Sequence, residues 1–373
     1  MDFLYVVLPA LIVLAAILIV WLSLRRSRFL RASSHSPARK AIERVALALV
    51  CVLVVILAAS SGINALLLHH ARAAMTGRLY LVDGHRMRLD CTGSGSPTLV
   101  LDSGLGNDGL VWQGVQPVLA QTTRVCSYDR AGMGWSDSVP PPRDADHIAD
   151  QLHGLLAEAQ INGPLVLMGH SIAGIYIRDY AARYPAQVAG LVFVDGSTPW
   201  QNRDPALKPE MQSQPSPLRV AMVQGMFVFG VPRWSGNCTH GFHNLPPAAQ
   251  KLASESRCHL IVSSPLGEAK SFDRSGDETI HTTFGDLPIL VLSSDPARAL
   301  ADHQPQAIIT VWSRMQTNLA HLSTRGRQII AKGSPHYIML ERPDLVEKEV
   351  PLFIEQIRGS APWPASFGTT TTE

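Results

Sequence analysis

Two long apolar runs come first in the chain. Phe3–Leu24 has 22 residues and Val45–Leu68 has 24, and neither contains a charged side chain. About 20 apolar residues are enough for a helix to cross a bilayer. A pair of buried core helices would instead show polar positions at helical spacing, which these runs almost lack. The pattern therefore predicts two transmembrane helices, at about 3–24 and 45–68, within a membrane anchor of residues 1–75.

The charges between these runs are almost all basic. The connecting loop contains Arg25, Arg26, Arg28, Arg31, Arg39, Lys40 and Arg44. The positive-inside rule places such a loop in the cytoplasm. A cleaved signal peptide is the alternative, but its positive charge would precede the apolar stretch, where this chain has only Asp2. We therefore expect a two-pass membrane protein whose remaining chain lies on the periplasmic or extracellular side.

Short unbroken apolar runs alternate with helical periodicity over residues 76–358. Strands are predicted at Thr98–Asp102, Arg124–Tyr128, Pro164–Met168, Leu191–Val194, Pro288–Leu292 and Arg327–Ala331, after a hairpin that turns at Asp83-Gly84. Helices are predicted at Ala145–Gln160, Ile172–Arg183, Ala307–Leu322 and Pro343–Ile357. This alternation indicates an α/β fold with a mostly parallel sheet covered on both faces. It stops over about 196–286, which indicates an insertion, and residues 359–373 are expected to form a flexible tail.

Charge and cysteine content narrow the function. The net charge of +2 combines +6 in residues 1–76 with −4 in the rest, which excludes a uniformly basic nucleic-acid binder. Cys51 lies in the second apolar run. The other four cysteines are even in number on the expected oxidising side, and we predict the disulfides Cys91–Cys126 and Cys238–Cys258. A zinc site of Cys238, His240, His243, Cys258 and His259 is the alternative, but its spacing matches no standard zinc module.

A candidate nucleophile stands between the strand Pro164–Met168 and the helix that follows. The stretch reads Gly169-His170-Ser171-Ile172-Ala173-Gly174. Small neighbours let the backbone turn sharply and leave the Ser171 hydroxyl exposed at the carboxyl edge of the sheet. The N-terminus of the next helix favours negative charge at that place. The alternative is a purely structural role, in which the serine only caps the helix.

This stretch resembles the nucleophile elbow of the α/β-hydrolase superfamily, which would have Gly at position 173. Two further stretches resemble the superfamily in the right order. Thr98–Gly106 is similar to its strand and oxyanion loop, with Ser103 in the usual His place, and Tyr128–Ser136 is similar to its D-x-x-G-x-G-x-S loop. The resemblance covers most of residues 77–358. It implies an α/β-hydrolase fold over 76–358, with the insertion at about 196–286 as a cap.

A serine nucleophile needs a histidine to accept its proton and a carboxylate to orient that histidine. In the superfamily the base lies between the last strand and the final helix, which is the place of His336. Asp195, after Leu191–Val194, fits members with the acid after the sixth strand, such as some haloalkane dehalogenases. Asp295, after Pro288–Leu292, lies near the more common position but about two residues early. We favour Asp195 and keep Asp295 as the alternative; the histidines of the insertion, expected at the surface or in the cap, are His240, His243, His259 and His281.

These parts together predict a membrane-anchored serine hydrolase acting on an ester-like bond. The expected oxyanion donors are the backbone N–H groups of Leu105 and Ile172. The Met- and Phe-rich stretch Pro217–Pro232 favours an apolar acyl or aryl substrate, unless it only packs the cap onto the core. No cofactor or metal ion is implied; the expected partners are a small-molecule substrate and the lipid bilayer, with no nucleic acid. The alternatives are a non-catalytic ligand-binding or sensor protein, or an acyltransferase with the same triad.

Overall fold

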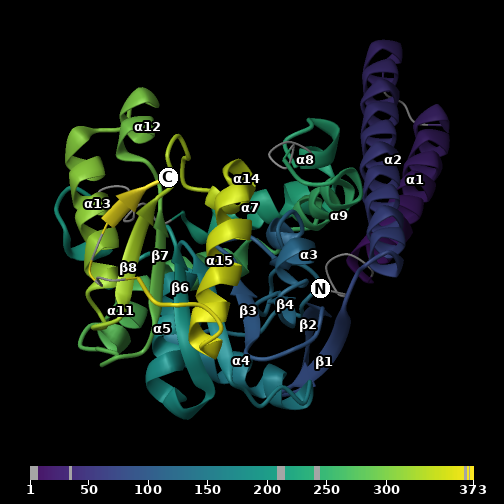
Figure 1. Cartoon of the computed structure of the whole chain (residues 1–373). Helices are drawn as coiled ribbons and strands as arrows, with labels where there is room; N and C mark the ends of the chain where they lie inside the picture. Colours follow the sequence, from purple (N-terminus) through teal and green to yellow (C-terminus); the bar gives the residue numbers. More distant parts are fainter. Residues whose placement is uncertain (1–6, 33–35, 208–214, 239–243, 365–367, 369) are drawn as a thin grey trace. The chain divides into compact units, whose positions relative to one another are not determined.

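Nine strands form one sheet in the part of the chain that the computed structural model describes, which is residues 7–32, 36–207, 215–238, 244–364, 368 and 370–373 (Figure 1). Their order across the sheet is β1-β2-β4-β3-β5-β6-β7-β8-β9. The first two pairs, β1/β2 and β2/β4, are antiparallel, and every later pair is parallel. The strands are β1 (Arg78–Val82), β2 (His85–Thr92), β3 (Thr98–Asp102), β4 (Val125–Tyr128), β5 (Leu165–His170), β6 (Val188–Val194), β7 (Ile289–Ser293), β8 (Gly326–Ile330) and β9 (Thr370–Thr372).

The chain divides into two units. The sheet unit comprises Thr76–Ser216, Phe242–Ala253 and Ile261–Glu373. Its helices are η2 (Gly109–Trp112), α3 (Gln116–Leu119), α4 (Ala145–Glu158), α5 (Ala173–Arg183), η3 (Pro185–Gln187), η4 (Gln201–Arg203), α10 (Ser263–Lys270), α11 (Phe272–Thr279), α12 (Pro296–Ala301), α13 (Gln306–Ala320), α14 (Ile338–Glu341) and α15 (Pro343–Arg358). The anchor unit comprises Met1–Met75, Pro217–Gly241 and Ser254–Leu260, with α1 (Leu8–Ala32), α2 (Pro37–Ala73), α7 (Pro217–Val228) and α8 (Val231–Trp234). Helix α9 (Pro247–Cys258) contributes residues to both units.

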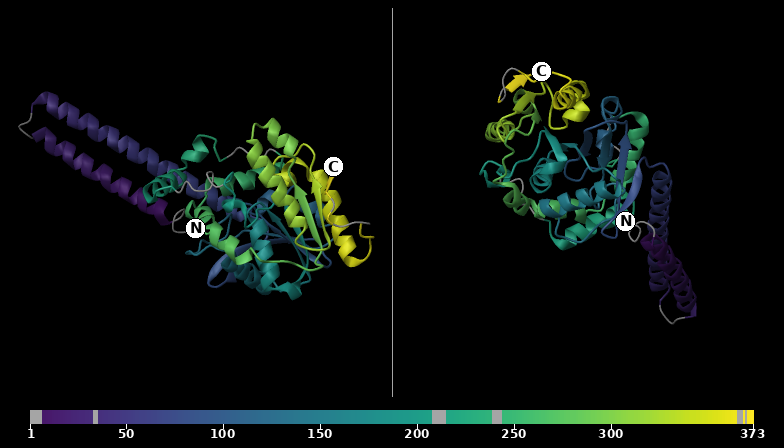
Figure 2. Two further views of the ribbon diagram at one scale, coloured as in Figure 1. Left: turned by 90° about the vertical axis from the view of Figure 1, so that its left-hand side faces the viewer. Right: turned by 60° about the horizontal axis from the view of Figure 1, so that its bottom comes forward.

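The sheet is covered on both faces, as the unbroken apolar strands predicted (Figures 1 and 2). Successive side chains of a strand point to opposite faces. Leu99 and Leu101 of β3 accordingly lie in one buried cluster with residues of α3, α14 and α15. Val100 lies in the other, with residues of α4, α5 and α13. Because these strands are parallel, their carboxyl ends lie at one edge of the sheet, where the loops carry the candidate site.

The end of the chain differs from the expected flexible tail. Thr370–Thr372 forms β9, which pairs in parallel with β8. The side chain of Gln328 accepts hydrogen bonds from the hydroxyls of Thr317 and Thr370, at 2.9 and 3.0 Å. A run of threonines has a high strand propensity, and here it meets an otherwise open sheet edge.

The anchor unit contains two helices that are long and apolar enough to cross a membrane. The first predicted run begins at residues 3–6, which lie outside the described residues. Both helices extend into the basic segment that was expected to be a loop, since α1 continues to Ala32 and α2 begins at Pro37. Most of their apolar side chains are exposed.

The unit that contains the two long apolar helices is larger than the predicted residues 1–75. Part of the insertion between β6 and β7 belongs to the same unit, namely α7, α8 and the end of α9. Cys238 and Cys258, near the ends of α8 and α9, form a disulfide within this unit. Cys91 of β2 and Cys126 of β4 form the other disulfide in the sheet unit, so both predicted pairings are present.

Candidate active site

Ser171 occupies a sharp turn between β5 and α5. Its φ angle is +55°, a left-handed conformation that costs about 1–3 kcal/mol for a residue with a side chain. Close backbone contacts on both sides enforce the turn. A Cβ added at Gly169 would lie 2.8 Å from the Ala173 carbonyl oxygen, and one at Gly174 would lie 2.9 Å from that of Ser197. The tight positions are therefore 169 and 174, while the side chain of Ala173 is accommodated in a buried apolar cluster.

His336 and Asp195 come together beside this turn. His336 lies in the loop between β8 and α14, and its Nδ1 lies 2.6 Å from Asp195 Oδ2. The other carboxylate oxygen of Asp195 accepts from the N–H and the hydroxyl of Ser294 and from Trp312 Nε1, each at 2.9 Å. The Asp195 side chain is 2% exposed. Burial alone would raise its pKa, but these donors, led by His336, outweigh burial and hold the pKa below its usual value.

Asp295, the alternative acid, accepts hydrogen bonds from two backbone N–H groups. One of its oxygens accepts from the Ala297 N–H at 2.9 Å, which caps α12. The other accepts from the Gly333 N–H at 2.8 Å. Asp295 thus ties the start of α12 to the loop after β8, the kind of capping role typical of a loop aspartate.

His170 links the turn at Ser171 to the loop that contains His336. Its Nε2 lies 3.1 Å from the His336 carbonyl oxygen, and its ring packs against the rings of His336 and Tyr337. Burial, together with the charge of His336, lowers the pKa of His170 to about 3. His170 is therefore neutral at physiological pH, and Nε2–H donates to the carbonyl. Among the hydrogen bonds of the described residues, none joins the Ser171 hydroxyl to His336, so that last contact belongs to the proposal below.

The loop Ser103–Gly106 is held by a buried arginine. The guanidinium of Arg130 donates from Nη2 to the Gly104 carbonyl at 3.0 Å and from Nη1 to the Ser103 carbonyl. It also pairs with Glu268 of α10 through two hydrogen bonds, at 3.0 and 2.9 Å. Because the N–H and C=O of a trans peptide point in opposite directions, the Gly104 contact directs the N–H of Leu105 away from Arg130. The hydrophobic and motif patterns of the sequence did not predict this role of Arg130 or its pairing with Glu268.

Ser103 has a clear structural role in place of the usual histidine. Its hydroxyl donates to the Asp108 carbonyl at 2.7 Å and accepts from Trp112 Nε1 at 3.1 Å. The Gly104 backbone packs closely against His170, since an added Cβ would lie 2.7 Å from His170 Nδ1. The loop Ser103–Gly106, the turn at Ser171 and the loop that contains His336 therefore form one contiguous set of contacts.

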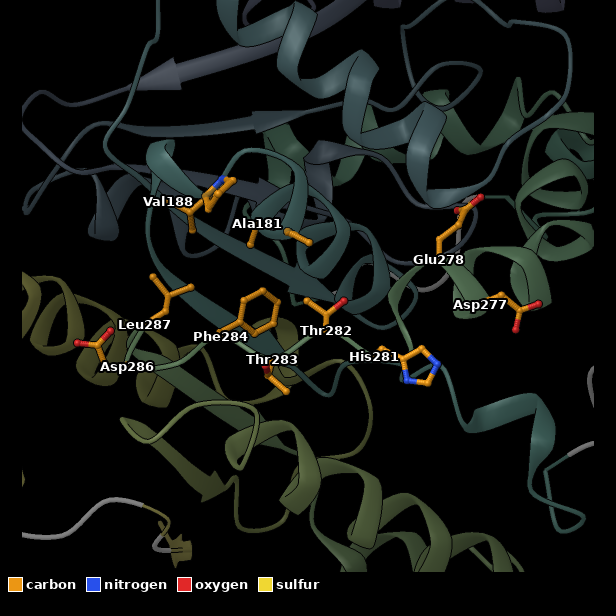
Figure 3. A pocket seen from close by; sticks show the side chains of 12 residues that line it. Ala181, Val188, Asp277, Glu278, His281, Thr282, Thr283, Phe284, Asp286 and Leu287 are labelled. Atoms are coloured by element: carbon orange, nitrogen blue, oxygen red, sulfur yellow. The ribbon is translucent and has the colours of Figure 1, made fainter.

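Two cavities of the sheet unit have different positions. One of about 310 Å³ is lined by Asp195, Ser294, Trp312 and His336, among others, and so lies beside the hydrogen-bonded pair of His336 and Asp195. The other, of about 610 Å³, is lined by Val188 at the start of β6 and by the segment before β7 (Figure 3). Because β6 has seven residues and spans roughly 20 Å, this second cavity lies at the opposite sheet edge. His281, one of the histidines predicted in the insertion, lines it and is remote from Ser171.

Of the remaining histidines of the insertion, the structure describes His259. His240 and His243 lie outside the described residues. His259 belongs to the anchor unit, where its Nδ1 and Nε2 lie 2.7 and 3.0 Å from the carbonyl oxygens of Glu255 and Asn64. Cys238 and Cys258 are bonded to each other, which removes both thiolates from the zinc alternative.

The sheet topology and the turn at Ser171 define an α/β-hydrolase fold. The chain belongs to the Alpha/beta hydrolase family, whose sequence profile matches residues 99–349.

An uncharacterized protein of Schizosaccharomyces pombe (C23C11.06c) is 45% identical over 84 residues, which is 22% of this chain and 16% of that protein. A probable transporter of Hormonema carpetanum, efuK, is 29% identical over 290 residues, or 70% of this chain and 40% of that protein. The chain thus spans less than half the length of either relative. Among solved structures, a bacterial membrane phospholipase A is 22% identical with a TM-score of 0.58, over 85% of this chain and 99% of that one. At this identity the likeness shows the fold.

Proposed function

We propose that this protein is a membrane-anchored serine hydrolase that cleaves an ester-like bond through an acyl-enzyme on Ser171. The main support is the hydrogen bond between His336 and the buried Asp195, beside a serine held at positive φ at the carboxyl edge of a parallel sheet. These are the geometric elements of a nucleophile–base–acid triad.

Asp195 determines which nitrogen of His336 carries the proton. A charged carboxylate can only accept hydrogen bonds, so the short contact requires a proton on His336 Nδ1. Nε2 is then left with a lone pair. In the proposed reaction this lone pair takes the Ser171 proton as Oγ attacks the carbonyl carbon. The ester C–O bond breaks, the alcohol leaves with that proton, and water hydrolyses the acyl-enzyme by the same relay.

The developing oxyanion would be held by the backbone N–H groups of Leu105 and Ile172. Each such donor contributes roughly 3 kcal/mol to catalysis. Ile172 immediately precedes α5, whose N-terminus also favours negative charge. Arg130 supports the other donor, because it fixes the Gly104–Leu105 peptide from the opposite side.

The anchor determines where the reaction would occur. The basic segment between α1 and α2 favours a cytoplasmic location for that segment. The sheet unit then acts on the periplasmic or extracellular side, which agrees with the two disulfides. The proposed substrate carries an apolar acyl or aryl group.

A fluorophosphonate probe on the full-length protein tests this proposal. The probe should label the wild type and should fail to label Ser171→Ala and His336→Ala, with each variant's folding checked by circular dichroism. Labelling that persists in Ser171→Ala would reject the nucleophile. A folded wild type that neither reacts with the probe nor hydrolyses p-nitrophenyl esters would favour a non-catalytic binding protein.

A further inference from the structure

Asn64 interrupts the apolar surface of α2 and is bonded to the insertion. Its side-chain N–H donates to the Phe227 carbonyl at 2.9 Å, and its Oδ1 accepts from Arg233 Nε at 3.0 Å. Arg233 in turn pairs with Glu255 through two hydrogen bonds, at 2.8 and 2.6 Å. The Asn64 side chain is fully buried. An uncompensated amide would be costly in an apolar run, so these bonds explain why asparagine is tolerated here.

Ser60 makes the second connection, four residues earlier on the same face of α2. Its hydroxyl donates to the Phe229 carbonyl and accepts from Trp234 Nε1 at 2.7 Å. Ser60 and Asn64 together hold the turn between α7 and α8 against the second half of α2. We call this pair the α2 clamp.

The clamp lies within reach of the hydrocarbon layer. Arg26 of α1 and Glu43 of α2 form an ion pair at 3.7 Å, so the charged ends of the two apolar runs lie at one level. At 1.5 Å per residue, Ser60 lies about 24 Å and Asn64 about 30 Å along α2 from Arg44. The hydrocarbon core of a bilayer is about 30 Å thick. A helix that enters the core at Arg44 therefore brings the clamp to its far boundary, and any tilt brings it deeper.

The segment held at this level presents an apolar surface. Leu218, Met222 and Met226 recur every four residues along α7 and form one exposed stripe, with Leu218 71% and Met222 64% exposed. Val231 and Trp234 of α8 are also exposed. Tryptophan is enriched at the boundary between hydrocarbon and water. We call these five side chains the α7–α8 face.

We propose that the α7–α8 face docks into the phospholipid layer at the far end of the span, where the α2 clamp holds it. This inference rests on the membrane anchoring proposed above. It commits to lipid because the α2 clamp holds the face at the depth of the far membrane boundary, where Ile63 and Leu66 of α2 are also exposed. The insertion thus contributes a monotopic element in addition to the two spanning helices.

Fluorescence quenching in phosphatidylcholine vesicles tests this placement. The full-length Cys51→Ala protein, with its disulfides intact, receives a single cysteine carrying a nitrobenzoxadiazole dye. Met222→Cys reports on the α7–α8 face, Leu53→Cys on the middle of the span, and Ala307→Cys on an exposed site of the sheet unit. Dye at 222 should be quenched by lipids with a nitroxide near the acyl carbonyl and protected from aqueous iodide. Dye at 53 should respond to lipid nitroxides, and dye at 307 to iodide alone.

The outcomes separate this inference from the proposed enzyme. Dye at 222 that iodide quenches as readily as dye at 307 would overturn the docking, even if Ser171 reacts with a fluorophosphonate. Dye at 222 in contact with lipid supports the docking, even if Ser171 fails to react. Dye at 53 without lipid contact would contradict both the membrane anchoring and the docking. Ser60→Ala with Asn64→Leu should weaken lipid quenching at 222 and leave it unchanged at 53; no change at 222 would overturn the role of the clamp.

Discussion

Asp195→Asn should reverse the tautomer of His336 while leaving its position unchanged. Three donors from Ser294 and Trp312 converge on one Asp195 oxygen. In the variant, the amide oxygen must stay with these donors, so the NH2 group replaces the oxygen that faces His336 Nδ1. That nitrogen then has to accept, and the proton moves to Nε2. The histidine can no longer take the Ser171 proton.

The expected loss in kcat/KM is on the order of 10³–10⁴-fold, the scale on which a misoriented triad base acts. This equals about 4–5.5 kcal/mol of transition-state stabilisation, at 1.36 kcal/mol per factor of ten. The assay is hydrolysis of a p-nitrophenyl ester by full-length protein in detergent, with substrate binding followed separately through KM. Because the exchange is nearly isosteric, the melting temperature serves as the check on folding.

Asp295→Asn is the matched control. Asparagine caps helices about as well as aspartate, so the contact with the Ala297 N–H survives. The contact with the Gly333 N–H is lost, at a cost of about 1 kcal/mol in unfolding free energy. The loss in kcat/KM should stay below tenfold, which corresponds to less than about 1.36 kcal/mol of transition-state stabilisation. If Asp295→Asn loses more activity than Asp195→Asn, or Asp195→Asn stays within tenfold of the wild type, the assigned acid is wrong.

Three further outcomes are expected. Arg130→Lys keeps the buried charge but loses the planar contacts to the Gly104 carbonyl, so kcat should fall at least about tenfold with a smaller change in KM. Misfolded protein would also lower the apparent kcat, so the melting temperature must match that of the wild type; a kcat within tenfold of the wild type in a folded variant would contradict this role. His170 has a folded-state pKa of about 3 against 6.5, so the unfolded state binds more protons below pH 6.5 and stability falls there by up to about 1.4 kcal/mol per pH unit. Urea unfolding should show a shallower decline from pH 6.5 to 5 in His170→Asn, and an equal slope would contradict the neutral state. Thiol counting on unreduced, denatured protein should find one free thiol, Cys51, whereas five would exclude both disulfides.

The sheet could be predicted because each strand is recognisable from a short stretch of sequence. Each central strand is a short apolar run, and the two-sided burial of Leu99, Val100 and Leu101 follows from that pattern. The nucleophile turn was equally visible, since Gly169 and Gly174 meet backbone atoms that leave no room for a Cβ. The strands and the glycines of the turn are visible in short stretches of sequence, although one contact that enforces the turn, between Gly174 and Ser197, joins distant residues.

The choice between Asp195 and Asp295 depends on distances across the sheet. Both follow a strand at the same edge, and spacing alone favoured neither strongly. In the structure their partners differ: Asp195 lies beside His336 and accepts from Ser294 and Trp312, which belong to distant segments, whereas Asp295 caps α12. Arg130 was missed for the same reason, because its partner Glu268 lies 138 residues away in the chain.

The second apolar run contains a polar feature that a hydropathy average does not detect. An average over the second apolar run hides the single polar face formed by Ser60 and Asn64. Helical spacing would have revealed it, since the two lie four residues apart. Without that face, residues 1–75 were expected to form the anchor alone, and the insertion was treated as one cap.

The insertion between β6 and β7 instead has two parts, one bonded to the sheet unit and the other to α2. Glu268 of α10, in the sheet unit, pairs with the arginine that holds the oxyanion loop, so this part supports the chemistry. The α7–α8 segment, in the anchor unit, is bonded to α2. Because the two parts have separate partners, changes to the α2 clamp should alter activity on lipid in vesicles while sparing that on a small soluble ester. Changes to Glu268 should impair both, since the oxyanion loop serves every substrate.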